Sequence, residues 1–383
     1  MPRKNGGRFP LRGSIVLRKS KSGEWLYYCV VAIEGRQKWL KVPGAQTKRN
    51  AEAYRAEIIA EINRGDYYEL PRCTFGEFWD RWFQTAKGEL RPNTIRNYQE
   101  VLNLYVLPAF EGRQISKIGR EEIERWKSEL LSRLSPSTVA HAITKLKRIF
   151  KDALDWGYIK RNPLKGVSLP SIPRVEASFL DASQVRLALA AAPSLQWQTF
   201  LLTAITTGLR ISELVAMRWA HLKWDEGKYF VAEQYYCRGA DKGFKPPKTD
   251  YSRTDVQLTP QCVRYLRDHK TEQARHRLQH PGYTDLGLIF PRNKGTIYSP
   301  SHIRQEIWLP ILKRAGLPPV RLHDLRHTCA ALLIDQGESP KYIQQQLRHK
   351  NIQTTFNVYG HLFPERSREA AERLDLAIFG GKP

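Results

Sequence analysis

A short segment that favours neither helix nor strand interrupts this chain of 383 residues near its middle. Residues 166–178 contain Pro170 and Pro173 and show no strong hydrophobic period, which is typical of a linker between domains. One hydrophobic core rarely serves a chain of this length, so two or three domains are expected. The patterns on either side of the linker predict three parts, with boundaries at residues 1–68, 72–165 and 176–383.

The first part has the pattern of a small sheet backed by a helix. Turns separate three stretches that are rich in β-branched and aromatic residues, which predicts strands at 14–18, 25–33 and 37–42. A helix is then expected from the N-cap residue Thr47 to Gly65. Such a module can be a folding cap or a DNA-binding domain. The first fifty residues hold twelve Lys or Arg against two acidic residues, which favours DNA binding through Arg18, Lys19 and Lys21.

Apolar residues at helical spacing dominate the second part. Helices are expected at 75–85, 93–107, 120–132 and 136–156, the second of them ending at Pro108. The aromatic residues of the first helix, Trp79 and Trp82 among them, are expected in a core rather than stacked on bases. The candidate phosphate contacts are the basic residues Arg91, Arg96, Lys145, Lys147, Arg148 and Lys151.

The third part mixes helices with short strands. Helices are expected from Asp181 or Ser183 to 192, and at 194–207, 211–219, 260–278, 301–314, 323–336 and 340–349, with strands at 229–232 and 254–258. Residues 364–379 predict an amphipathic helix, which would dock on a neighbouring subunit or pack on its own domain. The predicted fold class is therefore multidomain and mainly α, with small β elements.

The charge and the cysteines indicate the binding partner and the cellular compartment of the protein. The formal net charge is +24, distributed as +10 in residues 1–50, −3 in 51–71, +8 in 72–175 and +9 in 176–383. Three separate basic segments indicate several DNA-contacting modules rather than one basic tail. Five scattered cysteines argue against a disulfide framework and a zinc knuckle. With no apolar run of 18 residues, we expect a cytoplasmic, nucleoid-associated protein without a transmembrane helix.

Two local patterns indicate a phosphate site. Arg210 follows Gly208 and begins a predicted helix. A guanidinium fork and a helix N-terminus both favour phosphate. Glu213, one turn later, can hold the Arg210 guanidinium in place. His323 and Arg326 lie three apart on another predicted helix and so share a face. His327 has zinc-binding spacing from His323, but no further ligands complete a set, so we expect it to support the site from behind.

A lysine and a phenol complete the candidate set. Lys242, Lys245 and Lys248 lie between two predicted strands, where a lysine can reach into a cleft and donate a proton. Sequence reasoning alone does not choose among them. Tyr359 follows His349 by ten residues, and its phenol, with a pKa near 10, needs activation before it can attack phosphorus.

Taken together, these fragments resemble the tyrosine recombinases, the phage integrase family. The four matching stretches are Thr207 to Glu213, Pro247-Lys248-Thr249, His323 to His327, and Leu347-Arg348-His349 followed by Tyr359. The second of them selects Lys248 over its neighbours. The resemblance also implies an arm-type DNA-binding domain at 1–68, a helical SAM-like core-binding domain at 72–165 and a mixed α/β catalytic domain at 176–383.

The resemblance implies a site-specific recombinase that integrates or excises a mobile element such as a prophage or conjugative transposon. Tyr359 would attack a DNA phosphodiester and form a 3′-phosphotyrosyl bond. Arg210, Arg326 and His349 would stabilise the transition state, Lys248 would protonate the leaving oxygen, and His323 would assist proton transfer. The bond energy stays in the intermediate, so neither ATP nor Mg²⁺ is expected. A homotetramer would act on core-type and arm-type sites through a Holliday junction, with accessory DNA-bending or excision factors.

One position departs from the family pattern. The family usually has glycine before the last histidine, where this chain has Arg348. Its guanidinium was expected either to point outward to the DNA backbone or to crowd the phosphate. Two other functions stay open: a type IB topoisomerase-like nicking-closing enzyme that uses the same chemistry, and a non-catalytic DNA-binding regulator.

Overall fold

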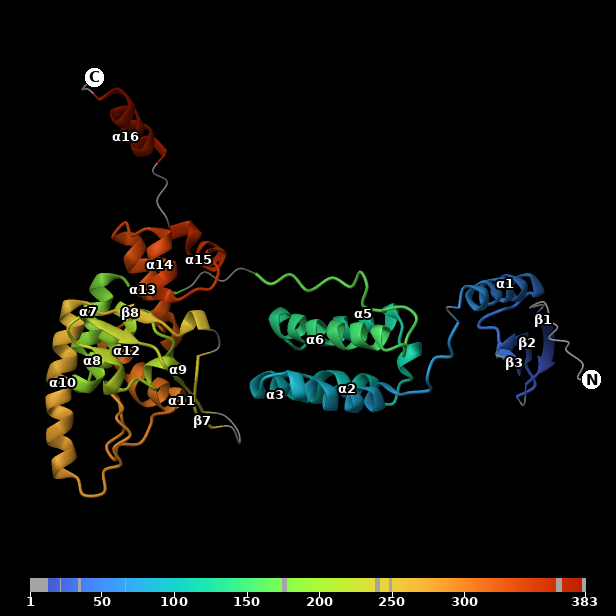
Figure 1. Cartoon of the computed structure of the whole chain (residues 1–383), viewed down its shortest axis with the longest axis horizontal. Helices are drawn as coiled ribbons and strands as arrows, with labels where there is room; N and C mark the ends of the chain where they lie inside the picture. The colour runs from blue at the N-terminus through green and yellow to red at the C-terminus, as the bar shows by residue number, and fades with distance from the viewer. Residues whose placement is uncertain are drawn as a thin grey trace, which may run out of the picture. The chain divides into compact units, whose positions relative to one another are not determined.

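The chain divides into two compact units, residues 1–172 and 173–383, and the boundary falls inside the predicted linker (Figure 1). The structure is a computed structural model that describes residues 13–20, 22–33, 36–65, 67–173, 178–237, 242–247, 250–362 and 367–380. Helices dominate both units and the sheets are small, which confirms the predicted fold class. Each unit is described by itself, and the finer division into three domains stays a prediction.

The first unit begins with an antiparallel sheet in the order β1-β2-β3, covered by one helix. Its elements are β1 (Ser14–Lys19), β2 (Trp25–Ile33), β3 (Arg36–Lys41) and α1 (Lys48–Arg64). Thr47 caps α1 by accepting from the Asn50 N–H at 3.3 Å, and Gly65 ends the helix at φ 78°. Cys29 and Val31 of the sheet pack against Ala51 of the helix. The predicted sheet-plus-helix module is confirmed.

The rest of the first unit is helical. Its helices are α2 (Phe75–Glu89), α3 (Pro92–Val101), α4 (Leu107–Phe110), α5 (Arg120–Leu131) and α6 (Pro136–Asp155). Trp82 of α2 is buried and donates from its indole N–H to Asp152 of α6 at 2.6 Å. Trp79 stacks on Trp82 at 5.5 Å between ring centroids, so the prediction that these aromatics form a core is confirmed.

Proline lies inside two helical segments of the structure, and only at Pro108 was the helix expected to end. The helix expected to stop at Pro108 continues through the π-helical segment Leu102–Val106 into α4, and Pro108 lies in its first turn. Pro310 lies in the same way behind a second π-helical segment, Ile303–Trp308. Proline lacks an N–H and its ring clashes with the carbonyl four residues earlier. The wider π turn makes room for that ring, so the chain remains helical.

The second unit surrounds helix α8 with helices and two small sheets. Its helices are α7 (Ala182–Ala190), α8 (Leu195–Thr207), α9 (Ile211–Leu214), α10 (Pro260–Gln279), α11 (Pro300–His302), α12 (Leu309–Ala315), α13 (Leu325–Asp335), α14 (Pro340–Leu347), α15 (Ile352–Tyr359) and α16 (Ser367–Phe379). The strands are β4 (Leu222–Lys223), β5 (Lys228–Phe230) and β8 (Asp255–Gln257) in one sheet, and β6 (Gln234–Tyr236) and β7 (Gly243–Lys245) in the other. Asp181, not Ser183, caps α7. The hairpin β6-β7 and helix α15 were not predicted.

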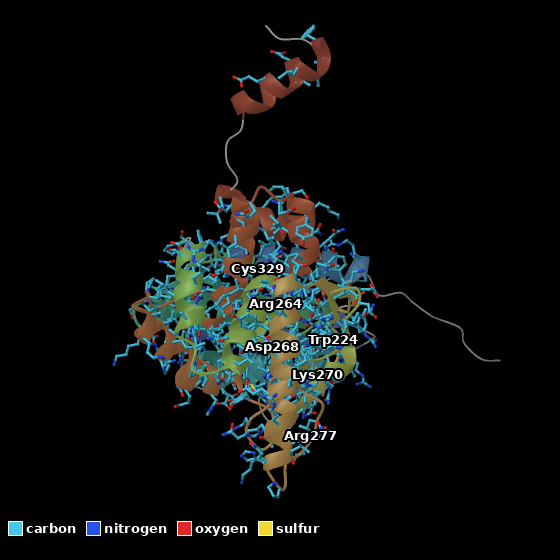
Figure 2. The ribbon with its side chains drawn as sticks, turned by 90° about the vertical axis from the view of Figure 1, so that its left-hand side faces the viewer. Trp224, Arg264, Asp268, Lys270, Arg277 and Cys329 are labelled. Carbon is cyan, nitrogen blue, oxygen red and sulfur yellow. The ribbon has the colours of Figure 1, made fainter. Side chains whose placement is uncertain are left out.

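Helix α10 lies along the outside of this unit and carries a basic face (Figure 2). Lys270 places its ammonium 5.3 Å from the ring centre of Trp224, which stacks on Trp219. Arg277, nearer the end of the helix, pairs with Asp285. These contacts partner the basic side chains within the protein itself.

The last helix, α16, exposes its apolar side chains. Leu374, Leu376, Ile378 and Phe379 are between 59% and 77% exposed, so they do not pack on the chain's own domain. Among the described residues, no helix is both long enough and apolar enough to cross a membrane.

Candidate active site

Arg210 follows a tight turn at the end of α8. Gly208 adopts the left-handed conformation at φ 61°, which glycine takes without a Cβ penalty, and the chain turns there into α9. The buried carboxylate of Glu213 accepts the Arg210 backbone N–H at 2.9 Å and its Nη1 at 3.0 Å. Helix α9 is a single turn rather than the predicted helix at 211–219, so the carboxylate, and not a long helix dipole, fixes this guanidinium.

Arg326 joins three elements at one point. It lies near the start of α13 and is 5% exposed. Its Nη1 donates to the Gly208 carbonyl at 2.6 Å, and its Nη2 donates to the Leu347 carbonyl at the end of α14. Both acceptors are neutral, so they leave the positive charge uncompensated. Burial, reinforced by Arg210, lowers the pKa of Arg326 to about 10, and the group stays charged at neutral pH.

His349 follows α14 and is neutral. Its Nδ1 lies 2.9 Å from the Thr355 hydroxyl of α15. Burial and the charge of Arg326 lower the pKa of His349 to about 3. The Thr355 hydroxyl can donate to Nδ1, and in that tautomer Nε2 carries the ring proton and is a neutral hydrogen-bond donor.

His323 is placed differently from the prediction. It lies in the 3₁₀ turn Leu322–Asp324 that precedes α13, so His323 and Arg326 do not share one α-helix. Arg326 still lies close enough to act on His323: burial, and then the charge of Arg326, lower the pKa of His323. The Asp324 carboxylate stabilises the turn by accepting a hydrogen bond from the Arg321 backbone N–H at 3.0 Å.

Tyr359 ends α15 and is 2% exposed. Its hydroxyl lies 2.7 Å from Nδ1 of His327, so His327 contacts the phenol directly. Burial raises the pKa of Tyr359, and the charge of Arg326 opposes that rise. Burial also lowers the pKa of His327. In the free chain a protonated phenol therefore faces a neutral imidazole.

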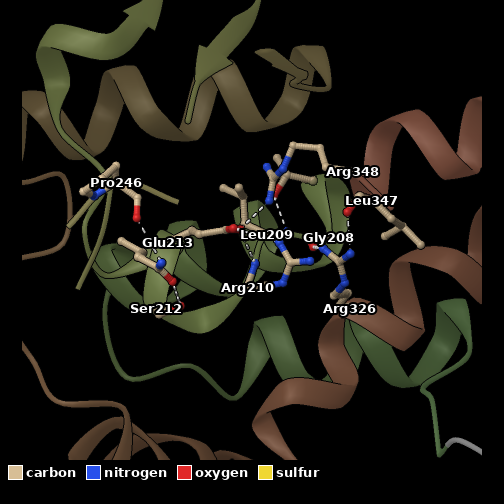
Figure 3. A network of polar contacts seen from close by, with 11 residues as sticks. Gly208, Leu209, Arg210, Ser212, Glu213, Pro246, Arg326, Leu347 and Arg348 are labelled. Atoms are coloured by element: carbon tan, nitrogen blue, oxygen red, sulfur yellow. Dashed lines mark hydrogen bonds and ion pairs between the residues drawn. The ribbon is translucent and has the colours of Figure 1, made fainter. Parts of the chain in front are cut away.

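Arg348 points inward, which corrects the expectation that it faces the DNA backbone. Its backbone adopts the left-handed conformation at φ 55°, and no other non-glycine residue among those described has a positive φ. The side chain is buried and donates from Nη2 to Oε2 of Glu213 (Figure 3). Glu213 thus holds two guanidiniums, those of Arg210 and Arg348. Sequence reasoning did not find this pair, although an arginine in a glycine position was the signal for it.

The predicted lysine lies outside the described residues, as does Lys21. Lys248 follows the hairpin β6-β7, whose strands pair Gln234 with Lys245. Lys245 is described, and its ammonium lies 5.2 Å from the Tyr236 ring centre. The choice of Lys248 therefore stays with the family motif.

The predicted DNA contacts of the first unit differ in exposure. Lys145 is buried, with its ammonium 5.7 Å from the Tyr98 ring centre, and burial lowers its pKa, so it is not a surface contact. Lys147 donates to the Val167 carbonyl at 2.7 Å. Arg18 lies 5.9 Å from the Trp39 ring centre on the sheet. The exposed members of the predicted set are Arg18, Lys19, Arg91, Arg148 and Lys151. Arg96 is half-buried.

Comparisons with known proteins agree with this geometry. The phage integrase family matches residues 178–366, and the phage integrase N-terminal SAM-like domain matches residues 74–131. This chain belongs to the phage integrase family. It is a tyrosine recombinase, an enzyme that cuts and rejoins DNA at specific sites.

Relatives and solved structures support the same family and fold. The ICEBs1 integrase of Bacillus subtilis (strain 168) is 27% identical over 343 residues, covering 87% of this chain and 91% of that protein. A Tn1549 transposon integrase in complex with transposon right-end DNA matches with a TM-score of 0.67 and 19% identity, over 79% of this chain and 99% of that one. A lambda integrase tetramer bound to a Holliday junction matches with a TM-score of 0.57 and 17% identity, over 92% and 95%.

Proposed function

We propose that this recombinase integrates and excises a mobile element, with Tyr359 as its nucleophile. The observation that carries the proposal is the arrangement at the end of α15. There the Tyr359 hydroxyl lies 2.7 Å from Nδ1 of His327, and the charge of the buried Arg326 guanidinium acts on the phenol. Relatives named as integrases of mobile elements support the biological role.

In the proposed reaction a neutral imidazole of the site takes the phenol proton of Tyr359, the phenol oxygen attacks the phosphorus, and the bond from phosphorus to the 5′-oxygen breaks. The products are a 3′-phosphotyrosyl bond and a free 5′-hydroxyl. Arg210, Arg326 and neutral His349 stabilise the charge that develops on the non-bridging oxygens. Lys248 delivers a proton to the leaving oxygen and His323 assists proton transfer. His327 holds the phenol in position, and Glu213 holds Arg210.

The assembly is inferred from a structural neighbour. The lambda integrase structure is a tetramer bound to a Holliday junction, and it matches 92% of this chain. We infer a homotetramer that exchanges strands in pairs, with α16 docking on a neighbouring subunit. The sheet at the N-terminus would bind arm-type sites through Arg18 and Lys19. The helical part would bind core-type sites through Arg91, Arg96, Arg148 and Lys151, and accessory bending or excision factors would set the direction.

A nicked suicide duplex tests the nucleophile. It carries a short direct repeat, to be located by searching the DNA that flanks this gene, and a nick placed so that cleavage releases a short fragment and traps the covalent adduct. Wild-type protein should form the adduct, and Tyr359→Phe should form none. Tyr342→Phe is the control, because Tyr342 lies on the neighbouring helix α14 and should retain activity. An adduct formed by Tyr359→Phe would refute the assignment.

A supercoiled plasmid without the repeat separates the recombinase from a topoisomerase-like enzyme. Both would use the same tyrosine, but only the topoisomerase-like enzyme would relax a plasmid that lacks the site. We expect relaxation and strand exchange to require the repeat. Efficient relaxation of the plasmid without it would favour the nicking-closing enzyme.

A further inference from the structure

Arg348 occupies a position whose backbone suits glycine, and its side chain is buried against a carboxylate. A residue with a Cβ is disfavoured in the left-handed conformation, which Arg348 adopts at φ 55° and ψ 49° where it ends α14. The side chain reaches the carboxylate of Glu213 and is buried together with it, at 1% and 2% exposure. A buried charge is stable only with a partner, so the two groups depend on each other.

Glu213 is shared between a buried guanidinium and a half-exposed one. Its Oε2 accepts from Arg348 Nη2 and from the Arg210 backbone, and its Oε1 accepts from Arg210 Nη1 (Figure 3). The Arg210 side chain is 37% exposed, so it is the member of the trio that a DNA phosphate can reach. Without Arg348, the full carboxylate charge would act on Arg210 alone.

We propose that Arg348 is a positioning residue that neutralises Glu213 from the buried side, so that Arg210 presents its full charge to the scissile phosphate. The hydrogen-bond partners of Arg326 are the neutral carbonyls of Gly208 and Leu347. With Arg348 present, three guanidiniums face one carboxylate and the cluster carries a net charge of +2. With an apolar residue at 348 the net charge would be +1.

The extra charge matters most in the transition state. A phosphodiester carries one negative charge, and attack by the Tyr359 oxygen, after loss of its proton, adds a second. A cluster of charge +2 therefore complements the transition state better than the bound substrate, and such differential binding accelerates the chemical step. Loss of Arg348 should slow cleavage while DNA binding changes little. This reasoning rests on the proposed Tyr359 site.

The test is a double-mutant cycle on Arg348 and Glu213, read as the first-order cleavage rate of the suicide duplex at saturating protein. Arg348→Met should slow cleavage at least tenfold and change the DNA dissociation constant less than threefold. Glu213→Gln in the wild-type background should also slow it, because Arg348 loses its buried partner. In the Arg348→Met background the same change should speed cleavage at least fivefold, because the neutral amide no longer offsets the positive charge of Arg210. Arg348→Lys should restore most of the rate.

The sign reversal is the decisive outcome. If Glu213→Gln slows the Arg348→Met protein further, or if Arg348→Met cleaves at the wild-type rate, the proposal is wrong. If Arg348→Met does not fold, the double variant is compared with Glu213→Gln alone, and a slower double variant refutes the proposal. Arg314→Met is the charge control: Arg314 donates to the Ala191 carbonyl and should leave the rate unchanged. Adduct formation by wild type but not by Tyr359→Phe shows independently whether the proposed site stands.

Discussion

The left-handed backbone of Gly208 positions both Arg210 and Arg326. The chain turns there towards Arg210, and the Gly208 carbonyl accepts from Arg326. A Cβ added there would lie 2.5 Å from Cδ2 of Leu347 and 3.3 Å from Sγ of Cys329. Both neighbours are buried, so neither can move freely aside. In Gly208→Ala the left-handed conformation costs about 1 kcal/mol. Overpacking destabilises the fold by roughly a further 1–3 kcal/mol. The reduced conformational entropy of the unfolded chain offsets about 0.5 kcal/mol of this loss.

Gly316→Ala is the matched control. Gly316 ends α12 in nearly the same conformation, at φ 64°, but nothing lies within 4 Å of its added Cβ. It should therefore lose only about 0.5 kcal/mol, from the backbone alone. The free energy of unfolding, measured in urea by tryptophan fluorescence, should fall by about 1.5–3.5 kcal/mol in Gly208→Ala. Equal losses in the two variants would refute the steric argument. Gly208→Ala should also slow cleavage, since the Gly208 carbonyl holds Arg326.

Three further predictions concern buried polar groups. Burial lowers the pKa of His349 to about 3, below the ordinary value near 6.5. The folded state therefore keeps this imidazole neutral, and its contribution to the free energy of unfolding is complete above pH 6.5 and is lost as the pH falls towards 3. The free energy of unfolding in urea should fall from pH 7 to pH 5, by at most about 1.4 kcal/mol per pH unit from this group, and the fall should be smaller in His349→Asn; an unchanged slope would contradict the burial. His327→Ala should slow adduct formation about tenfold, since it frees the Tyr359 phenol from a bond of roughly 1–1.5 kcal/mol, and a wild-type rate would exclude a positioning role. Asp152→Ala leaves the Trp82 indole N–H unpaired and should lower unfolding free energy by roughly 1–3 kcal/mol, a loss that Asp155→Ala should not share.

Much of the fold could be predicted because local signals coincide with it. Thr47 and Gly65 mark both ends of α1, and Gly208 marks the end of α8, since capping and left-handed turns depend on a few neighbouring residues. The continuation of the helix past Pro108 could not be predicted from proline alone, whereas the helix across Pro310 was expected from its apolar spacing. Their continuation depends on a π turn that buries Leu102 and Trp308, which is a tertiary effect.

The sequence named the candidate residues of the site but not their contacts. Arg210, Arg326, His349 and Tyr359 could be named from motif order, because each motif is local. The contact of His327 with Tyr359 spans 32 positions, and that of Arg348 with Glu213 spans 135, so sequence spacing carries no information about either. Arg348 was expected to point outward to the DNA backbone or to crowd the phosphate, and its pairing with the buried carboxylate of Glu213 could not be foreseen from the sequence.

The most direct test of the central claim is to find which atom carries the DNA. Trapped adduct from the suicide duplex is digested with protease and nuclease, and the modified peptide is sequenced by mass spectrometry. We predict a phosphotyrosine at Tyr359, joined to the 3′ end of the cleaved strand, with a free 5′-hydroxyl on the released fragment. A phosphate on any other residue, or attachment through the 5′ end, would contradict it.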